Sequence, residues 1–391
     1  MSELTRAPRG RSFQLMLTAS LLGFGGYALM LPLVPLWAAL GGAGAFGAGA
    51  TTALFMLATV GTQFVVPGLL RRVGYRAVLG MGMVLLGAPT PLYALTAKLP
   101  LLLGVSLVRG IGFGLVTVAG SALVAELVAP AEHGRAAARY GLAVGLPQLV
   151  LLPAGVGVAQ WVGFAGLFAA AGVLPLLGAA IVLGVRAPRR SRATGSGPAQ
   201  DWRAVRSSAG PWLAMLTCSI AQGGLFTFLP LALPRPGPLV PTALFATVAG
   251  ALLGRVVAAE LAHRRQLSGR LVAAGVLLAV VGMTAEVAAV LGSGALSAVA
   301  AIAGAALVGM GFGTVQNDSQ VVMFAAAGVA GYGAASAAWN IAYDTGTGLG
   351  AVGLGATAQT MGYPAAFALS AAVLAVVLPA AARTHRLLAR S

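Results

Sequence analysis

The strongest constraint on this chain is a succession of apolar runs, each about as long as a membrane-spanning helix and separated by short polar segments. A helix needs about 20 consecutive apolar residues to cross the hydrocarbon core of a bilayer. Only 8% of the 391 residues are charged and 59% are hydrophobic. A soluble domain of this length could not cover its surface with so few charges. We therefore predict an all-α integral membrane protein.

Twelve apolar runs have the length of a membrane span. The first run follows Arg6, Arg9 and Arg11 and is too long for a cleaved signal sequence, so we predict that it is a transmembrane helix. The twelve expected transmembrane helices lie near residues 13–38, 50–70, 77–96, 99–128, 138–160, 162–185, 211–233, 239–261, 270–291, 294–316, 331–356 and 363–382.

The distribution of arginine predicts the orientation. If the N-terminus is cytoplasmic, the outer connections hold only Lys98 and Arg235, and the inner ones hold most of the other basic residues. This asymmetry follows the positive-inside rule. We expect a multi-pass protein of the cytoplasmic (inner) membrane with both termini in the cytoplasm. The net charge of +16 does not indicate nucleic-acid binding, because the arginines lie in short loops rather than on one face with aromatic residues.

The chain divides into two halves that resemble each other. A basic linker rich in Ser, Gly and Pro, residues 187–210, separates a six-helix bundle over 1–186 from a second over 211–391. Gly110-Ile-Gly-Phe-Gly114 in the fourth run returns as Gly309-Met-Gly-Phe-Gly313 in the tenth. Two parallel six-helix repeats are a known transporter plan. Further echoes pair Tyr140-Gly141 with Tyr332-Gly333, and Gly163 and Phe168 with Gly362 and Phe367.

Arg109 is a charged residue inside the fourth predicted transmembrane helix. An arginine near the bilayer midplane costs roughly 2.5–3.5 kcal/mol on insertion scales, so such residues usually face a polar partner or a watery cavity. Either Arg109 is the counter-charge of a transport site or it is permanently paired with helix carbonyls.

Asp344 lies in the middle of the eleventh predicted transmembrane helix, with Asn340 one turn before it and Trp339 beside that. Burial there would disfavour the charged carboxylate. The residue could therefore load and release a proton during transport, or it could hold helices together by hydrogen bonds.

Other polar and aromatic residues complete the predicted site, since transporter sites are apolar pockets with a few such groups. Glu286, toward the outer end of the ninth predicted helix, either couples protons or reaches the membrane surface. We assign proton coupling to Asp344, Arg109 and Glu286, and substrate binding to Tyr27, Arg109, Gln148, Gln222, Trp339, Asn340 and Asp344. For the acids at predicted cytoplasmic helix ends we expect salt bridges, such as Arg255 with Glu260 or Asp318.

Four motifs resemble those of the major facilitator superfamily over essentially the full chain. They are Pro67-Gly-Leu-Leu-Arg-Arg-Val-Gly74-Tyr-Arg76, Leu107-Val-Arg109-Gly110-Ile-Gly112-Phe-Gly114, Ala125-Glu126-Leu-Val-Ala-Pro130-Ala-Glu132-His-Gly134-Arg135-Ala136 and Pro153-Ala-Gly155-Val-Gly157. The resemblance implies two pseudo-symmetric six-helix bundles. The chain departs from the family pattern at three positions. Arg71 stands where an aspartate is usual, and Pro67 stands where a glycine is usual. Leu152 replaces a glycine before the proline of the helix-five antiporter motif.

The resemblance also implies gating or motif roles for residues in these motifs, and Arg255 and Asp318 join them because they lie near predicted cytoplasmic helix ends. The residues assigned to gating are Gly74, Arg76, Gly110, Gly112, Gly114, Glu126, Arg135, Pro153, Arg255 and Asp318.

The sequence argues against other classes. ATP-driven transport needs a phosphate-binding loop with a lysine, and the sole lysine, Lys98, lies in no such motif. One cysteine and three distant histidines predict no metal site. We predict a non-enzymatic, monomeric secondary transporter without a cofactor, whose two halves rock about a cavity near Arg109 and Asp344. Proton-coupled export of a hydrophobic, drug-like molecule is the leading function. A proton-coupled importer and a non-transporting membrane sensor are the alternatives.

Overall fold

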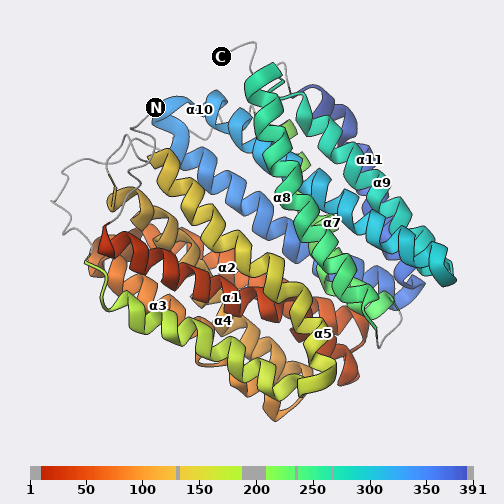
Figure 1. Ribbon diagram of the computed structural model, residues 1–391, viewed down its shortest axis with the longest axis horizontal. Coiled ribbons are helices and arrows are strands. Elements are labelled where there is room, and N and C mark those ends of the chain that lie inside the picture. The colour runs from red at the N-terminus through yellow and green to blue at the C-terminus, as the bar shows by residue number, and fades with distance from the viewer. Residues whose placement is uncertain (1–9, 129–132, 187–207, 234–236, 266, 385–391) are drawn as a thin grey trace. The chain divides into compact units, whose positions relative to one another are not determined.

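The computed structural model describes residues 10–128, 133–186, 208–233, 237–265 and 267–384 (Figure 1). These residues form helices and contain no strand. Among them, eleven helical segments are long and apolar enough to cross a membrane. The predicted all-α, multi-pass fold is therefore confirmed.

The chain forms two compact units. Unit 1 contains Met1–Gly42 and Leu54–Ala193, and unit 2 contains Ala43–Ala53 and Thr194–Ser391. The start of α2 belongs to unit 2 because the backbone N–H of Ala45 donates a hydrogen bond of 2.8 Å to the side chain of Gln359. The helices are α1 (Arg11–Leu40), α2 (Gly44–Val73), α3 (Tyr75–Gly87), η1 (Thr90–Leu95), α4 (Leu99–Glu126), α5 (His133–Val182), α7 (Ala209–Ala232), α8 (Leu239–Arg265), α9 (Leu271–Leu291), α10 (Gly294–Met361) and α11 (Tyr363–Ala382).

Two of these helices each contain two transmembrane segments. In α5 the break is at Gly163, whose φ of 77° is outside the helical region. In α10 the indole N–H of Trp339 donates to the hydroxyl of Ser319 at 3.1 Å. Twenty residues of straight helix would separate this pair by about 30 Å, so α10 folds back on itself between them. Its second half is the predicted eleventh transmembrane helix.

Glycines with positive φ make four corresponding turns in the two units. Gly74 (φ 83°) joins α2 to α3, and Gly269 (φ 81°) precedes α9. Gly163 (φ 77°) breaks α5, and Gly362 (φ 83°) separates α10 from α11. A residue with a side chain is strained at such angles, whereas glycine is not. At Gly74, Gly163 and Gly362 these turns allow one helix to follow another with a single residue between them.

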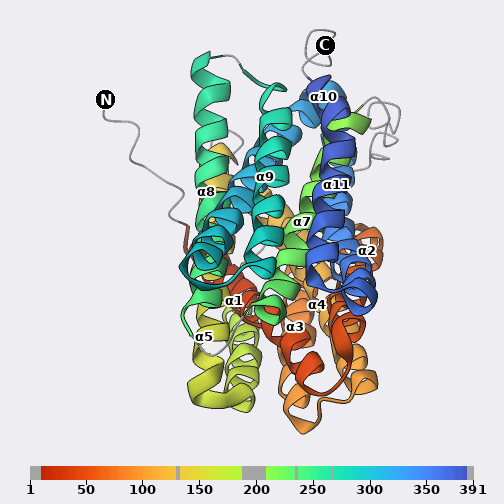
Figure 2. The ribbon, with the colours of Figure 1, turned by 90° about the vertical axis from the view of Figure 1, so that its right-hand side faces the viewer.

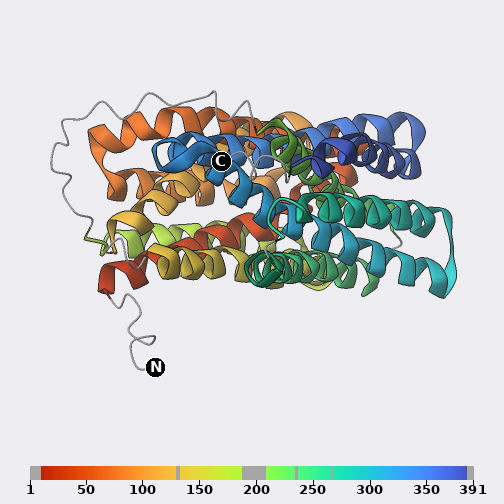
Figure 3. The same cartoon turned by 90° about the horizontal axis from the view of Figure 1, so that it is seen from above.

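In unit 1, the Gly-x-Gly-Phe-Gly motif brings α4 against two helices at once. A methyl group at Gly110 would overlap the backbone carbonyl of Phe55 on α2, and one at Gly112 would lie 2.5 Å from the backbone nitrogen of Leu86 on α3. The Thr59 hydroxyl also donates to the carbonyl oxygen of Gly110 at 3.0 Å. Alternate glycines of the motif therefore face different neighbours. Elsewhere in this unit α1 packs along α5 (Figure 1, Figure 3).

In unit 2, the second copy of the motif brings α10 against two helices, α8 and α9. A methyl group at Gly309 would overlap the carbonyl of Thr247 on α8, and one at Gly311 would overlap the carbonyl of Gly275 on α9. Small residues at helix crossings allow close backbone approach in lipid, where apolar burial supplies little driving force for association. The repeated motif is thus a pair of helix crossings, and it places α9 and α10 side by side (Figure 2).

This packing makes a prediction for Gly309. We expect Gly309→Ala to lower the free energy of unfolding by about 1–3 kcal/mol, because the added methyl group forces α8 and α10 apart. Gly353→Ala in the same helix is the matched control, since a methyl group there meets no atom within 4 Å. Thermal unfolding of both purified variants in detergent measures the difference. Equal unfolding temperatures for the two variants would contradict this account of the crossing.

Candidate functional site

In unit 1, Arg109 lies enclosed among α1, α2, α3 and η1. Its side chain is 2% exposed. The guanidinium donates hydrogen bonds to the carbonyl oxygens of Leu86, at 3.2 Å, and Gly26, at 3.5 Å. Leu86 is in the last turn of α3, where helix carbonyls lack an intrahelical donor. The backbone partners that the sequence allowed as an alternative are therefore present.

Two aromatic rings complete this environment. The guanidinium carbon of Arg109 lies 5.7 Å from the ring centroid of Phe55 and 5.6 Å from that of Tyr93. A cation over an aromatic face is stabilised by the ring quadrupole, more strongly when water is excluded. None of these four partners carries a negative charge. The guanidinium is held in place without being neutralised by them, and an anionic or carboxylate group could still complement it.

Tyr27 belongs to the same aromatic cluster. Its ring stacks on Phe113 with centroids 4.2 Å apart and on Phe55 at 5.7 Å, and Phe24 meets Phe113 edge-on at 5.4 Å. Tyr27 was predicted from the sequence, but these phenylalanines were not. Phe113 could have been found, since it is the aromatic residue that both copies of the glycine motif contain, whereas Phe55 has no distinguishing sequence neighbour.

Two other predicted residues of unit 1 lie on α5. The amide of Gln148 donates to the Val144 carbonyl at 3.3 Å within its own helix. Pro153 is buried inside α5, where its ring removes a helix hydrogen bond. Gln148 is half-buried, so its local bond leaves the side chain able to turn toward a ligand.

In unit 2, Asp344 is 4% exposed on the second half of α10. The surrounding backbones approach closely: a methyl group at Gly346 would overlap the Leu216 carbonyl of α7, and one at Gly223 would lie 2.8 Å from Thr347. Asp344 is therefore held in a tight contact between α7 and α10. Gln222, 5% exposed, is on the same stretch of α7.

An aromatic group lies one turn from Asp344. Trp339 stacks on Tyr343 with centroids 6.2 Å apart, and Tyr343 meets Phe312 at 5.8 Å. The half-buried Asn340 donates to the Ser336 carbonyl at 2.8 Å. The predicted residues of unit 2 therefore gather on one stretch of α10, with Gln222 on the neighbouring α7. Tyr343 and Phe312 join this group although the sequence did not predict them.

Asp318 performs a different task from the one predicted. It is fully buried, and its carboxylate accepts hydrogen bonds from the backbone N–H of Gly269 (2.9 Å) and of Val272 (3.0 Å). It thus binds the turn before α9 and the positive end of that helix. Arg255, by contrast, is exposed, and Glu260 pairs with Arg264 one turn later. The structure thus replaces the expected Arg255 pairings with a buried helix cap and a surface ion pair.

The corresponding turn in unit 1 is also bound by an acid. The hydroxyl of Tyr75, directly after Gly74, donates to Glu126 at the end of α4 at 3.1 Å. In each unit, a carboxylate from the fourth helix of the repeat holds the turn between its second and third helices. Arg76 is exposed, and the side chain of Arg135 lies outside the described residues.

The family model of the Major Facilitator Superfamily matches residues 15–351. The chain belongs to the Major Facilitator Superfamily. This confirms the resemblance seen in the sequence motifs. A comparison with curated protein sequences found no significant match.

Solved structures share the Major Facilitator Superfamily fold with this chain. A bacterial homolog of the human lysosomal transporter Spinster, inward-facing and unoccupied, matches with a TM-score of 0.71 and 14% identity, covering 98% of each chain. A mutant of the nucleoside transporter NupG gives 0.77 and 11%, over 94% of this chain and 98% of that one. A mutant of the peptide transporter POT in complex with sulfate gives 0.76 and 14%, over 97% and 96%. At these identities the likeness shows the fold. The family is one of transporters of small molecules rather than of enzymes.

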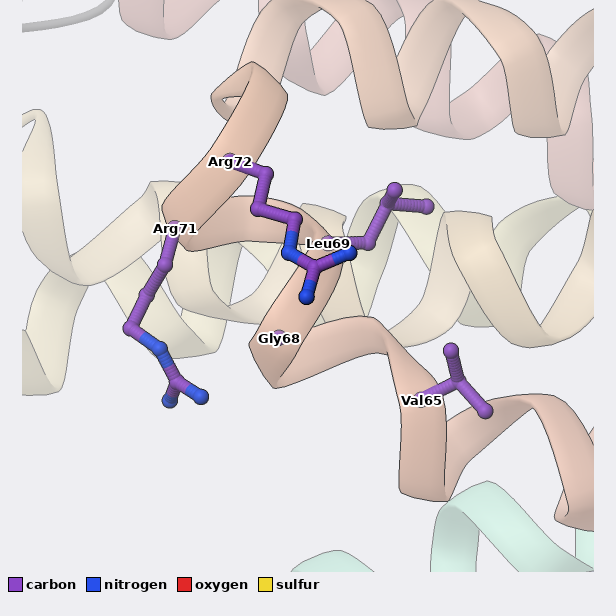
Figure 4. A pocket seen from close by; sticks show the side chains of 5 residues that line it. All are labelled: Val65, Gly68, Leu69, Arg71 and Arg72. Atoms are coloured by element: carbon purple, nitrogen blue, oxygen red, sulfur yellow. The ribbon is translucent and has the colours of Figure 1, made fainter.

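The family's loop between helices two and three is basic here. Arg71, where an aspartate is usual in Major Facilitator Superfamily members, and Arg72 line a shallow pocket with Val65, Gly68 and Leu69 at the end of α2 (Figure 4). Both guanidiniums are exposed. Cations at a helix C-terminus are favoured by its dipole, so this pair also stabilises the end of α2.

The structure contradicts one of the two interpretations that the sequence allowed for Glu286. A surface-reaching side chain would be exposed, whereas Glu286 is 0% exposed on α9. The snorkelling interpretation is therefore wrong, because the glycine-lined contact between α9 and α10 encloses the side chain.

The hydrogen bonds that Asp318 accepts from the turn before α9 lead to a prediction about stability. We expect Asp318→Ala to lower the free energy of unfolding by about 1–3 kcal/mol, because buried backbone N–H groups lose their acceptor. Glu260→Ala should change it by less than about 0.5 kcal/mol, since exposed ion pairs contribute little. Thermal unfolding in detergent compares the two alanine variants. A similar, small effect from both substitutions would rule out Asp318 as a structural cap.

Proposed function

We propose that this Major Facilitator Superfamily member exports hydrophobic small molecules from the cytoplasm in exchange for protons. Its two units would alternate access to opposite sides of the cytoplasmic membrane, with both termini in the cytoplasm. The proton gradient serves as the energy source, with no cofactor.

The observation that carries the proposal is Asp344. A mid-helix carboxylate is costly in a membrane protein and marks ion pathways and proton relays. Asp344 is almost fully buried between α7 and α10, beside the Trp339–Tyr343 aromatic pair. A residue in this setting can exist as a neutral acid when it is enclosed and as a carboxylate when water or a cationic ligand reaches it.

The surroundings support a hydrophobic substrate. In unit 1 the aromatic cluster of Tyr27, Phe55 and Phe113 presents large apolar faces next to Arg109. The described polar side chains in the two predicted regions are few, and several already bond to carbonyls of their own helix, as Gln148 and Asn340 do. A carrier of sugars would need more free hydrogen-bonding groups, whereas a carrier of apolar molecules needs stacking surfaces.

Direction and coupling can be tested together in inside-out vesicles with a preset pH gradient. An exporter that exchanges protons should concentrate a hydrophobic fluorescent dye inside these vesicles and dissipate the gradient as it does so. A panel of cationic and neutral dyes, first ranked by their ability to raise the thermal stability of the purified protein, supplies the probe. Dye movement in the opposite sense would make the protein an importer, and movement that leaves the gradient intact would refute proton coupling.

Asp344→Asn tests the coupling residue. We expect the variant to fold, because the amide has the same shape, and to lose gradient-driven dye accumulation down to the level of vesicles without the protein. Exchange of dye down its own gradient should persist. Glu260→Gln, an exposed acid on α8, is the matched control and should transport normally. Normal accumulation by Asp344→Asn would end the assignment of coupling to this residue.

Arg109→Lys tests whether the unit 1 cation acts through charge alone. Lysine keeps the charge but cannot make the two diverging bonds to Leu86 and Gly26. We expect folded protein with reduced transport, whereas Arg109→Met should lose transport altogether. Dye-flux rates normalised to folded protein compare them. Unchanged flux in Arg109→Met would make the residue purely structural.

A further inference from the structure

Glu286, to which the sequence assigned proton coupling, is a buried acid that the coupling proposed through Asp344 does not use. Its side chain is 0% exposed. In the described part of the chain, neither carboxylate oxygen has a hydrogen-bond partner. Buried polar groups are nearly always paired, so an orphaned carboxyl group requires an explanation.

Close helix packing encloses this carboxyl group. A methyl group at Gly304 of α10 would lie 3.0 Å from the Oε1 atom of Glu286 and 2.9 Å from the carbonyl oxygen of Gly282. The helices α9 and α10 are neighbours (Figure 2). The crossing of Gly282 with Gly304 therefore encloses the Glu286 side chain between them. No molecule larger than a proton can reach the carboxyl group while this crossing is closed.

Comparison of the two repeats shows what is unusual here. Gly112 of α4 contacts Gly82 and Leu86 of α3, and Gly311 of α10 contacts Gly275 and Ala279 of α9 in the same way. Equivalent positions of the two repeats therefore differ by 193 in residue number on the third helix and by 199 on the fourth.

With these differences in residue number, the positions of unit 2 that are equivalent to Tyr93 and Arg109 of unit 1 can be found. Glu286 corresponds to Tyr93, and Val308 corresponds to Arg109. In unit 1 the Tyr93 hydroxyl pairs with Ser106 at 2.8 Å while its ring faces Arg109. In unit 2 the place of Ser106 is taken by Ala305. Glu286 therefore occupies a position whose polar partner and cation have both been replaced by apolar residues.

The helices around α9 offer Glu286 no counter-charge. An acid could only repel an ionised Glu286, and the nearest one in sequence on α10, Asp318, binds the turn at the opposite end of α9. It is level with Val272, about 20 Å along the helix from Glu286 at 1.5 Å per residue. The charged residues of α8 all lie in its last eleven positions, from Arg255 onward. The only titratable groups on α11 and α7 are Tyr363 and Cys218, which are neutral.

An ionised carboxylate in such a place is strongly disfavoured, because nothing around it replaces the water that it has lost. We propose that Glu286 is a proton-binding site of unit 2, separate from Asp344, that holds its proton while the Gly282–Gly304 crossing is closed and exchanges it when that crossing opens. The site needs no transport to bind a proton. Its use in the transport cycle rests on the proposed proton coupling.

Infrared spectroscopy of the full-length protein tests the site directly. In a detergent without carbonyl groups at neutral pH, the wild-type protein should show the carbonyl stretch of a protonated carboxylic acid. Glu286→Gln should lose the component of this band that comes from Glu286, whereas Asp344→Asn should retain that component and lose only the contribution of Asp344. Glu286→Met, which fills the same apolar space without a polar group, gives the same comparison if the glutamine variant does not fold. A wild-type spectrum that matches the Glu286 variants in this region would overturn the proposal.

Glycine variants of α10 test the enclosure. We expect Gly304→Ala to shift the acid band and to speed its exchange in D2O, because the methyl group presses on Oε1 and opens the crossing. Gly353→Ala, in open space on the same helix, should leave both unchanged. Identical band positions and exchange rates in the two variants would contradict the enclosed site.

The outcomes also separate this inference from the proposed function. A Glu286 band together with normal dye accumulation by Asp344→Asn would preserve the proton site and reject coupling through Asp344. Absence of the band together with loss of accumulation in Asp344→Asn would do the reverse.

Discussion

The structure depends on the close approach of helix backbones at glycine. In lipid the apolar surface of one helix gains little by meeting that of another, so packing at short range must hold the bundle together. Gly110 and Gly112 in unit 1, and Gly309 and Gly311 in unit 2, let the fourth helix of each repeat touch two neighbours at backbone distance. Gly346 does the same for the second half of α10 against α7. These crossings also fix which side chains are enclosed.

Polar groups follow from the same constraint. A hydroxyl in a membrane helix has no water to bond, and it usually donates to a carbonyl one turn earlier. Thr227, Thr247 and Ser219 all do so, at 2.8–2.9 Å. Against this background of locally paired hydroxyls the exceptions are clear. Arg109 draws on carbonyls of other helices, and Glu286 draws on none.

The two units use one architecture with different chemistry. Turns at Gly74 and Gly269 have nearly the same φ, and each is held by an acid from the fourth helix of its repeat. The space between the third and fourth helices, however, holds a cation and a tyrosine in unit 1 and an acid in unit 2. The two units share one frame, and the differences at Tyr93/Glu286 and Arg109/Val308 give each unit its own buried ionisable group.

The sequence by itself determined the all-helical membrane fold, the repeat and the family. Apolar run length, the glycine motif and the spacing of arginines are local properties that a linear chain displays in full. Only the tertiary structure decided which buried charge meets which partner. Asp318 was expected to pair with an arginine but caps α9, and Glu286 was allowed a path to the surface but is sealed beside Gly304. The partner of a buried group depends on how each helix is rotated about its axis against its neighbours. When a helix is apolar on every face, its sequence does not show which face meets which neighbour.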